Sequence, residues 1–458
     1  MSTITSRIIP SQVRVDTEQG LKRVPTAIVL LIAGIITRCA VWIYLDPGNN
    51  DKHIDVIKYL VRYKTFPSLE TDMLAFHPPL YYWMAAPLFA LFASDKVVQL
   101  LSLAFSIATL WVLYKIIYRT EMIALRRARQ YSFLLACFLP QFVMFSLYVS
   151  NDSLTFLLGC LTVLQANRFV GSPDWKQGML LAIVTALGLL TKTTFLVYLP
   201  VLTSAVYLVK FQELRSRSRA VAAALAFLAI SGALGSYKYV DNYRRYTKPV
   251  MTGMDIPQDW SEGQKRSYRG LRSYIGFNLR RLILSPTLSP ATEGSYPLLL
   301  YGTFWYQHIP ESNFLAGQVS PYVYLGSAIY IVALAPTGVF FLGLLALVWR
   351  FPGFLRACDL QKSEHRRLAV SYIAAALLLV NLALVAATIA KYHEWGLMQG
   401  RYLFPALAGG FAVFSVGVGI LDKSVYGSRM LQSCIVILIA LFGLYFFSEI
   451  AYLEDIRL

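Results

Sequence analysis

The sequence has 458 residues, of which 57% are hydrophobic and 15% charged, and its mean hydropathy is +0.53. A soluble domain is closer to half apolar and a quarter charged, so the composition excludes an ordinary soluble protein. The net charge of +17 would suggest nucleic acid in a soluble chain. Most Lys and Arg, however, lie in short loops between apolar runs, as in the cytoplasmic loops of membrane proteins. The expected partner is therefore the lipid bilayer, and no nucleic acid.

The first apolar run, residues 24–45, is interrupted by one charge, Arg38. At 1.5 Å per residue it is long enough to cross about 30 Å of hydrocarbon. A polar segment of 23 residues precedes it and no small-residue cleavage site follows, which favours a retained helix over a cleaved signal peptide. Residues 1–23 are accordingly expected to form a cytoplasmic N-terminal segment.

Ten further apolar runs of spanning length follow in chain order. They lie at 96–118, 130–149, 153–170, 177–191, 194–210, 219–239, 322–349, 368–390, 400–421 and 429–451. Helices are the spanning structure that such long continuous runs allow. The chain is therefore predicted to be an all-α polytopic membrane protein with about eleven transmembrane helices, interfacial helices in its first external loop and a long late external loop.

The run at 78–92 decides the topology, because it is apolar but shorter than a comfortable span. If it crossed the membrane, three basic loops, at 118–130, 210–219 and 350–367, would face outward, against the positive-inside tendency. We therefore expect an interfacial helix whose aromatic side chains lie at headgroup level: Tyr81, Tyr82 and Trp83. The N-terminus is then cytoplasmic and the C-terminus external.

This sidedness divides the rest of the chain into three parts. A membrane catalytic module at 24–240 includes the first external loop at 46–95, an external loop occupies 241–320, and C-terminal transmembrane helices occupy 321–458. Nearly every unusual polar group falls on the external side. A secondary transporter more often carries such groups at mid-membrane, so the pattern favours an active site at the membrane surface.

The first external loop is rich in titratable groups. On a helix, Asp51 and Asp55 share a face, and a carboxylate whose pKa is raised by burial can take a proton from an attacking hydroxyl. A solvated amphipathic helix with acids near its N-terminus is the alternative. His77 could bind a metal or move a proton, although the two prolines that follow it also fit a simple turn. His53 and His77 are both expected to contact the substrate.

Further polar candidates stand at the external ends of later spans. Asn151 and Asp152 follow a serine between two spans, where Asp152 could also serve as a helix N-cap. Lys192 and Arg401 are isolated cations that could bind a lipid phosphate, or snorkel and anchor their helices. Tyr402 adjoins Arg401.

The long external loop supplies aromatic and basic residues. Trp305 and His308 lie in an aromatic cluster whose rings could stack on a sugar or anchor the loop to the membrane. The basic segment 265–281 is periodic enough to form one amphipathic surface helix.

The order of these motifs resembles the C-type (GT-C) membrane glycosyltransferases, and particularly the branch of protein O-mannosyltransferases and aminoarabinose transferases. The resemblance rests on an acidic first loop ending in "HPPLYYW", followed by "SND", "LGLLTKTTFLVYLPV" and "QGRYLFPAL", and it covers roughly residues 24–420. Many relatives carry adjacent Asp-Glu where this chain has Asn49 and Asn50 before Asp51, which leaves Asp51 and Asp55 as rival bases.

The resemblance implies an inverting hexosyl or pentosyl transferase that uses a polyprenyl-phosphate sugar donor. The first-loop Asp would be the general base, Asp152 the second acid, and Lys192 with Arg401 the phosphate site. Some branches use a divalent metal and others none, so the metal stays open and no other cofactor is expected. A lipid-linked or membrane-proximal acceptor, an extracytoplasmic site and a bacterial inner or cell membrane are expected. A non-catalytic transporter or flippase for a lipid-linked substrate is the alternative.

Overall fold

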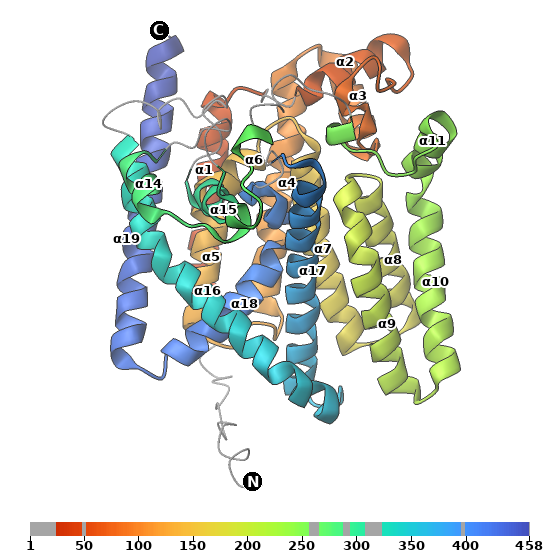
Figure 1. The fold of residues 1–458 in the computed structure, drawn as a ribbon, viewed down its shortest axis with the longest axis vertical. Helices are drawn as coiled ribbons and strands as arrows, with labels where there is room; N and C mark the ends of the chain where they lie inside the picture. The colour runs from red at the N-terminus through yellow and green to blue at the C-terminus, as the bar shows by residue number, and fades with distance from the viewer. Residues whose placement is uncertain are drawn as a thin grey trace.

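The computed structural model describes residues 24–47, 52–255, 265–286, 294–306, 323–394 and 399–457. Those residues form helices and connecting turns and contain no strand. The long helices run side by side between two ends of the molecule, and α2, α3 and α11 gather at the upper end in Figure 1, named here the loop-rich end. The all-α polytopic membrane fold expected from the sequence is thereby confirmed.

Nine helices in the described part of the chain are long and apolar enough to cross a membrane. They are α1 (Val24–Tyr44), α4 (Asp95–Tyr114) with the π-helical turn η3 (Lys115–Arg119), α7 (Asn151–Gly171), α9 (Tyr198–Leu214) after the 3-10 turn η4 (Thr193–Val197), α10 (Arg217–Gly235), α16 (Val323–Ala357), α17 (Ser363–Tyr392), α18 (Leu407–Leu421) after the 3-10 turn η7 (Gly400–Ala406), and α19 (Val425–Arg457). The sequence placed a span at each of these nine positions.

Two expected spans are shorter than predicted, so the count of eleven is not confirmed. The run at 177–191 forms α8 (Trp175–Leu189), and the run at 130–149 forms α5 (Arg126–Phe138) and α6 (Pro140–Phe145). The break between α5 and α6 has a local cause, because Pro140 has no backbone N–H to donate and its ring disfavours a continuous helix.

Arg38, which lies on the neighbouring helix α1, stabilises the break between α5 and α6. Its guanidinium donates hydrogen bonds of 3.0 Å to the carbonyl oxygens of Ala136 and Cys137, and one of 2.9 Å to Ser106 Oγ. The Ala136 carbonyl is the one that loses its helical donor at Pro140. Arg38 is fully buried, and these hydrogen-bond acceptors stabilise its positive charge within the bundle.

The segments between the spans form short helices. They are α2 (His53–Tyr63), the 3-10 turn η2 (Met73–Phe76), α3 (Leu80–Phe92), α11 (Tyr237–Tyr246), the 3-10 turn η5 (Gly253–Asp255), α13 (Leu271–Ile275), α14 (Leu279–Leu284) and α15 (Tyr296–Trp305). The single helix expected at 265–281 is wrong, because Gly270, with a φ of 61°, interrupts it before α13, and the non-helical residues 276–278 separate α13 from α14. A positive φ is readily adopted by glycine.

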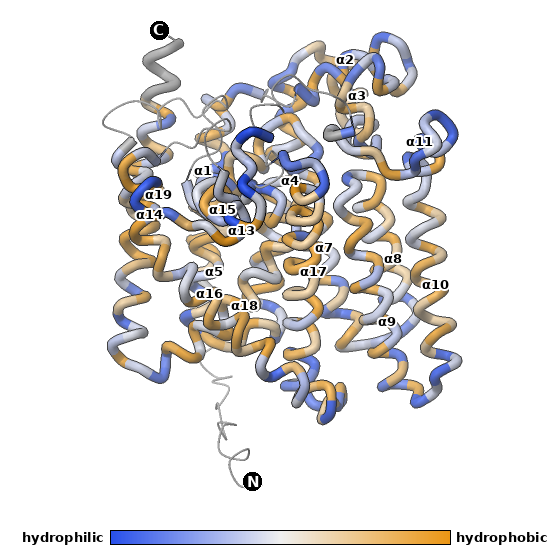
Figure 2. The backbone as a smooth tube through the Cα atoms, in the orientation of Figure 1, coloured by the Kyte–Doolittle hydropathy of each residue, from blue (hydrophilic) through white to orange (hydrophobic). Residues whose placement is uncertain are grey.

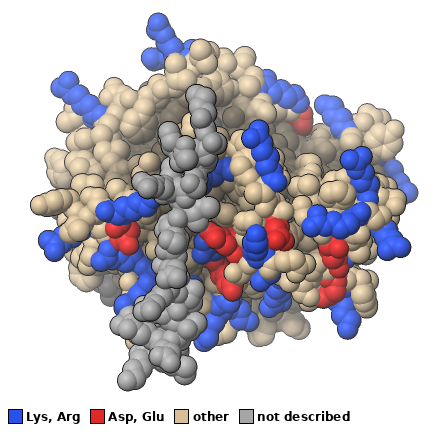
Figure 3. All heavy atoms as spheres, turned by 90° about the horizontal axis from the view of Figure 1, so that it is seen from below, with Lys and Arg blue, Asp and Glu red and all other residues tan. Residues whose placement is uncertain are grey.

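The helices are apolar along their length and hydrophilic at both ends (Figure 2). The lower face, where α9 meets α10 and α16 meets α17 (Figure 1), shows many Lys and Arg side chains and few acids (Figure 3). The loops at 118–130, 210–219 and 350–367 supply basic residues at the lower ends of their helices. A basic face opposite the loop-rich end is the charge asymmetry of a multi-pass membrane protein.

Candidate active site

Three buried charged side chains meet at the loop-rich end. They come from the start of α7, the turn between α8 and η4, and η7: Asp152, Lys192 and Arg401. The Lys192 ammonium donates to Asp152 Oδ1, and an Arg401 guanidinium nitrogen lies 3.7 Å from Asp152 Oδ2. The exposed fractions are 2% for Asp152 and 7% for each cation. This ion triad has a formal charge of +1.

The start of α7 is fixed by its neighbours in sequence. The Ser150 hydroxyl accepts a hydrogen bond of 3.0 Å from the Asp152 backbone N–H, so Ser150 is the N-cap. The reading of Asp152 as the cap is wrong. The Asn151 amide donates to the Thr191 carbonyl at 3.2 Å, which ties the first residue of α7 to the turn that carries Lys192.

Two glycines allow the segment with Arg401 to approach closely. A Cβ on Gly159 of α7 would lie 2.0 Å from the Pro405 carbonyl oxygen, and a Cβ on Gly400 would lie 2.5 Å from Phe304 Cα. Neither position leaves space for a side chain. The Gly400 backbone N–H also donates to Thr303 Oγ1 at 2.9 Å, so α15 holds the start of η7 in place.

Aromatic rings surround the two cations. The Tyr402 ring centre lies 5.0 Å from Lys192 Nζ and 5.3 Å from Arg401 Cζ, and the Phe145 ring centre lies 5.0 Å from Arg401 Cζ. Ring faces attract cations, more strongly where water is excluded. Tyr402 therefore lies in the cluster with Lys192 and Arg401 that the sequence selected, whereas Phe145 carries no chemical motif that would have singled it out.

The two first-loop histidines lie together in a neighbouring buried cluster. The ring centres of His53 and His77 are 5.4 Å apart, and His53 Nδ1 is 2.7 Å from the Tyr82 hydroxyl. Tyr81 is also buried, with its hydroxyl 2.9 Å from Ser102 Oγ. Both tyrosine rings are fully buried within the protein, whereas Trp83 is 40% exposed. Of the three aromatic side chains expected at headgroup level, Trp83 is therefore the one whose ring is accessible from outside the protein.

The acids of the first loop are placed differently from one another. Asp51 lies outside the described residues, and Asp55 is exposed in the first turn of α2. Burial raises the pKa of Asp72, and the charge of Asp55 raises it further, against the hydrogen bond that Asp72 accepts from the Leu74 N–H. The sequence analysis did not select Asp72 as a candidate.

The remaining candidates lie outside the ion triad. His308 is not among the described residues. Trp305 is 6% exposed and donates through Nε1 to Thr337 Oγ1 at 3.0 Å, so its indole takes part in the packing of α15 against α16. A further acid that the sequence analysis missed, Glu449, is buried on α19 and acts electrostatically on Tyr148, as Arg401 does.

The described residues do not form a metal site. No three His, Cys, Asp or Glu side chains among them converge in a way that could hold a metal ion. Asp152 already contacts two cations, Lys192 and Arg401.

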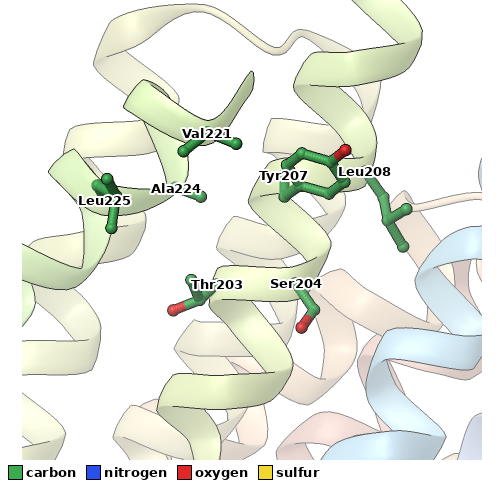
Figure 4. A pocket seen from close by; sticks show the side chains of 7 residues that line it. All are labelled: Thr203, Ser204, Tyr207, Leu208, Val221, Ala224 and Leu225. Carbon is green, nitrogen blue, oxygen red and sulfur yellow. The ribbon is translucent and has the colours of Figure 1, made fainter. Parts of the chain in front are cut away.

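A surface groove between α9 and α10 is separate from this site (Figure 4). It is lined mostly by apolar side chains along the two spans. The lining residues are Thr203, Ser204, Tyr207, Leu208, Val221, Ala224 and Leu225. It contains no charged group, which distinguishes it from the ion triad.

Comparison with known proteins confirms the resemblance drawn from the sequence. Residues 76–235 match the family model described as dolichyl-phosphate-mannose-protein mannosyltransferase, a family of C-type membrane glycosyltransferases. The matched region contains Asp152 and Lys192 and ends before Arg401. No curated protein sequence matches the chain.

Solved structures of two other proteins are similar to the chain. An Archaeoglobus fulgidus oligosaccharyltransferase with a tethered acceptor peptide is 11% identical, with a TM-score of 0.47, over 94% of this chain and 55% of its own. The chain thus spans about half the length of that protein. ArnT from Cupriavidus metallidurans is 13% identical in the apo state and 14% identical bound to undecaprenyl phosphate. The TM-scores are 0.38 and 0.36, over 86% and 87% of this chain and 77% and 78% of ArnT.

Proposed function

We propose that the protein is an inverting glycosyltransferase that moves a sugar from a polyprenyl-phosphate donor to a lipid-linked or membrane-proximal acceptor. The observation that carries the proposal is the buried ion triad of Asp152, Lys192 and Arg401 at one end of the bundle. The matched family, whose description names a dolichyl-phosphate sugar, supports the class of donor.

The charge of the triad suits a phosphodiester. Two cations and one carboxylate leave a formal charge of +1, which the single negative charge of a polyprenyl-phosphate sugar neutralises. A pyrophosphate-linked donor would carry more negative charge than the triad can match. Burial of an unmatched charge is costly, so the balance favours a monophosphate carrier.

In the reaction, Lys192 and Arg401 stabilise the negative charge that develops on the leaving phosphate. Arg401 can present two parallel N–H donors to phosphate oxygens, and Lys192 supplies a point charge. A first-loop acid, Asp51 or Asp55, orients the acceptor hydroxyl and removes its proton. The oxygen attacks the anomeric carbon opposite the phosphate, so one displacement inverts that centre.

We place this site on the extracytoplasmic side, in a bacterial inner or cell membrane. The support is the charge asymmetry of the fold, because the lower face is basic (Figure 3) and cytoplasmic loops carry the excess of Lys and Arg. The loop-rich end that carries the triad then faces away from the cytoplasm.

A non-catalytic transporter or flippase is the second candidate, and Arg38 argues against it. A charge within a span usually marks a substrate pathway. The guanidinium of Arg38, however, bonds to carbonyls at the break between α5 and α6 and to Ser106, which gives it a structural role.

The proposal is tested by donor binding and sugar transfer in lipid nanodiscs. Lys192→Gln and Arg401→Lys should each weaken donor binding roughly 10- to 150-fold, since a hydrogen bond to a charged group contributes about 1.5–3 kcal/mol. Lys238→Gln is the matched control, because Lys238 is a buried cation paired with Asp241 at 3.2 Å on α11. Parent-like donor binding in both triad variants would contradict the proposal, and lipid movement between leaflets without acceptor would favour the flippase.

A further inference from the structure

The segment 265–284 forms a basic surface at the loop-rich end, named here the arginine ledge. It contains α13 and α14, and Figure 2 shows hydrophilic stretches in both. Five of its cations are exposed: Lys265, Arg266, Arg269, Arg272 and Arg280. Residues 265–286 contain no Asp or Glu, so the ledge has no acidic side chain of its own.

Within the part of the chain that the structure describes, the guanidinium groups of four of these cations have no partner. Lys265 lies 3.6 Å from Glu394, but the guanidinium groups of the four exposed arginines make no ion pair or side-chain hydrogen bond in the described chain. By contrast, the other basic side chain of α14, Arg281, donates to the Ser285 carbonyl at 2.7 Å. The four unpaired arginines are therefore free to bind an external anion.

Large apolar side chains are exposed between the arginines. Leu271 is 73% exposed, Ile275 70% and Leu284 71%. A basic surface with interspersed apolar side chains is typical of a segment that lies at the level of lipid headgroups and buries its apolar groups in the acyl region.

The contacts of α14 place the ledge at that level. The Ser327 hydroxyl donates to the Ile283 carbonyl at 2.6 Å, and the Tyr330 hydroxyl donates to the Pro286 carbonyl at 3.1 Å. Both donors belong to the first two turns of the span α16, which begins at Val323. At 1.5 Å rise per residue, the ledge lies within about 10 Å of the end of that span.

We infer that the arginine ledge binds anionic phospholipid headgroups of the leaflet at the loop-rich end. The partner is inferred from charge complementarity, because four unpaired guanidinium groups can bind headgroup phosphates. The flanking apolar side chains can contact the acyl chains. The positive-inside tendency predicts few cations at this end, so general charge bias does not account for them. This inference does not depend on sugar transfer.

The test is photocrosslinking of the full chain in nanodiscs that contain a photoactivatable phosphatidylglycerol or phosphatidylcholine probe. Crosslinked peptides are mapped by mass spectrometry, so that labelling of 265–286 is separated from labelling of other basic loops. The anionic probe should label the ledge at least tenfold more than the zwitterionic one. Each Lys or Arg near an anionic surface strengthens binding roughly fivefold, so Arg269→Gln/Arg272→Gln/Arg280→Gln should remove the excess.

The matched control removes the same charge at the opposite end of the molecule. Arg215→Gln/Arg217→Gln/Arg219→Gln alters three exposed arginines at the start of α10 and should leave labelling of the ledge unchanged. If the ledge variant does not fold, the parent chain still decides the matter, since 0.5 M salt should abolish the excess by screening. Equal labelling of the ledge by both probes at low salt would overturn the inference.

Discussion

Replacing Asp152 with asparagine preserves the shape of the side chain and removes the negative charge that lies between two buried cations. In the parent chain Asp152 neutralises part of the charge of Lys192 and Arg401. With asparagine the formal charge of the cluster rises from +1 to +2. We expect Asp152→Asn to bind polyprenyl monophosphate more tightly than the parent does, and to transfer sugar more slowly because it releases the carrier more slowly.

The magnitude follows from Coulomb's law. A phosphate that contacts both cations at about 2.8 Å lies roughly 5 Å from the Asp152 carboxylate. At an effective dielectric constant of about 20, the repulsion that is removed amounts to about 3 kcal/mol. Allowing for relaxation, the dissociation constant should fall roughly 10- to 150-fold. Without ligand, the variant should have a lower melting temperature, because two buried cations lose their shared partner.

The assay is a thermal-unfolding series in detergent over a range of polyprenyl monophosphate concentrations. The rise in melting temperature at saturating ligand should be larger for Asp152→Asn than for the parent, since tighter binding to the folded state adds stability. Asp241→Asn is the matched control, because it removes the partner of the buried Lys238 on α11 and should leave ligand binding unchanged. Weaker or unchanged ligand binding in Asp152→Asn would refute the reasoning.

Three further predictions address the base, the topology and the break in the bundle. Asp51→Asn should abolish transfer and Asp55→Asn should be the next most harmful change, with a loss on the order of 10²–10⁴-fold for a general base; near-normal turnover of both variants would reject the assignment. Cysteines introduced at Arg126 and Ser261 should react with impermeant reagents from the cytoplasmic and external sides respectively, and reaction of both from one side would reject the topology. Arg38→Met should lower stability by about 1–3 kcal/mol, because the buried Ala136 carbonyl is left without a donor, measured as a fall in melting temperature, while Arg38→Lys should recover part of it; an unchanged melting temperature would contradict the structural role.

Most of the fold was predictable because long apolar runs in a membrane chain allow little besides helices. The sequence did not predict the break at Pro140, since its stability depends on Arg38 from another helix. It also did not predict that Tyr81 and Tyr82 are buried within the protein. Their hydroxyls contact Ser102 and His53, which lie in other segments of the chain.

The sequence was sufficient to select each member of the ion triad as a candidate site residue. It was not sufficient to predict that the three side chains contact one another. Sidedness alone placed Asp152, Lys192 and Arg401 at the same end of the bundle. Their contact requires the close approach of α7 and η7, which the absence of a side chain at Gly159 allows. A glycine within an apolar helix gives no indication in the sequence of which backbone it meets.

The ion triad also distinguishes the role of a general base from the role of a counter-ion to Lys192 and Arg401. A general base must have a lone pair available to the acceptor hydroxyl, whereas the carboxylate of Asp152 is already bound to Lys192 and lies beside Arg401. Two buried cations without a counter-ion would be costly, so Asp152 compensates Lys192 and Arg401. Under the proposed function it would share them with the phosphate of the donor. The proton would then go to another carboxylate of the first loop, which supplies Asp51, Asp55 and Asp72. Of these, Asp72 has a pKa raised by burial, a shift that brings a carboxyl closer to the working range of a base.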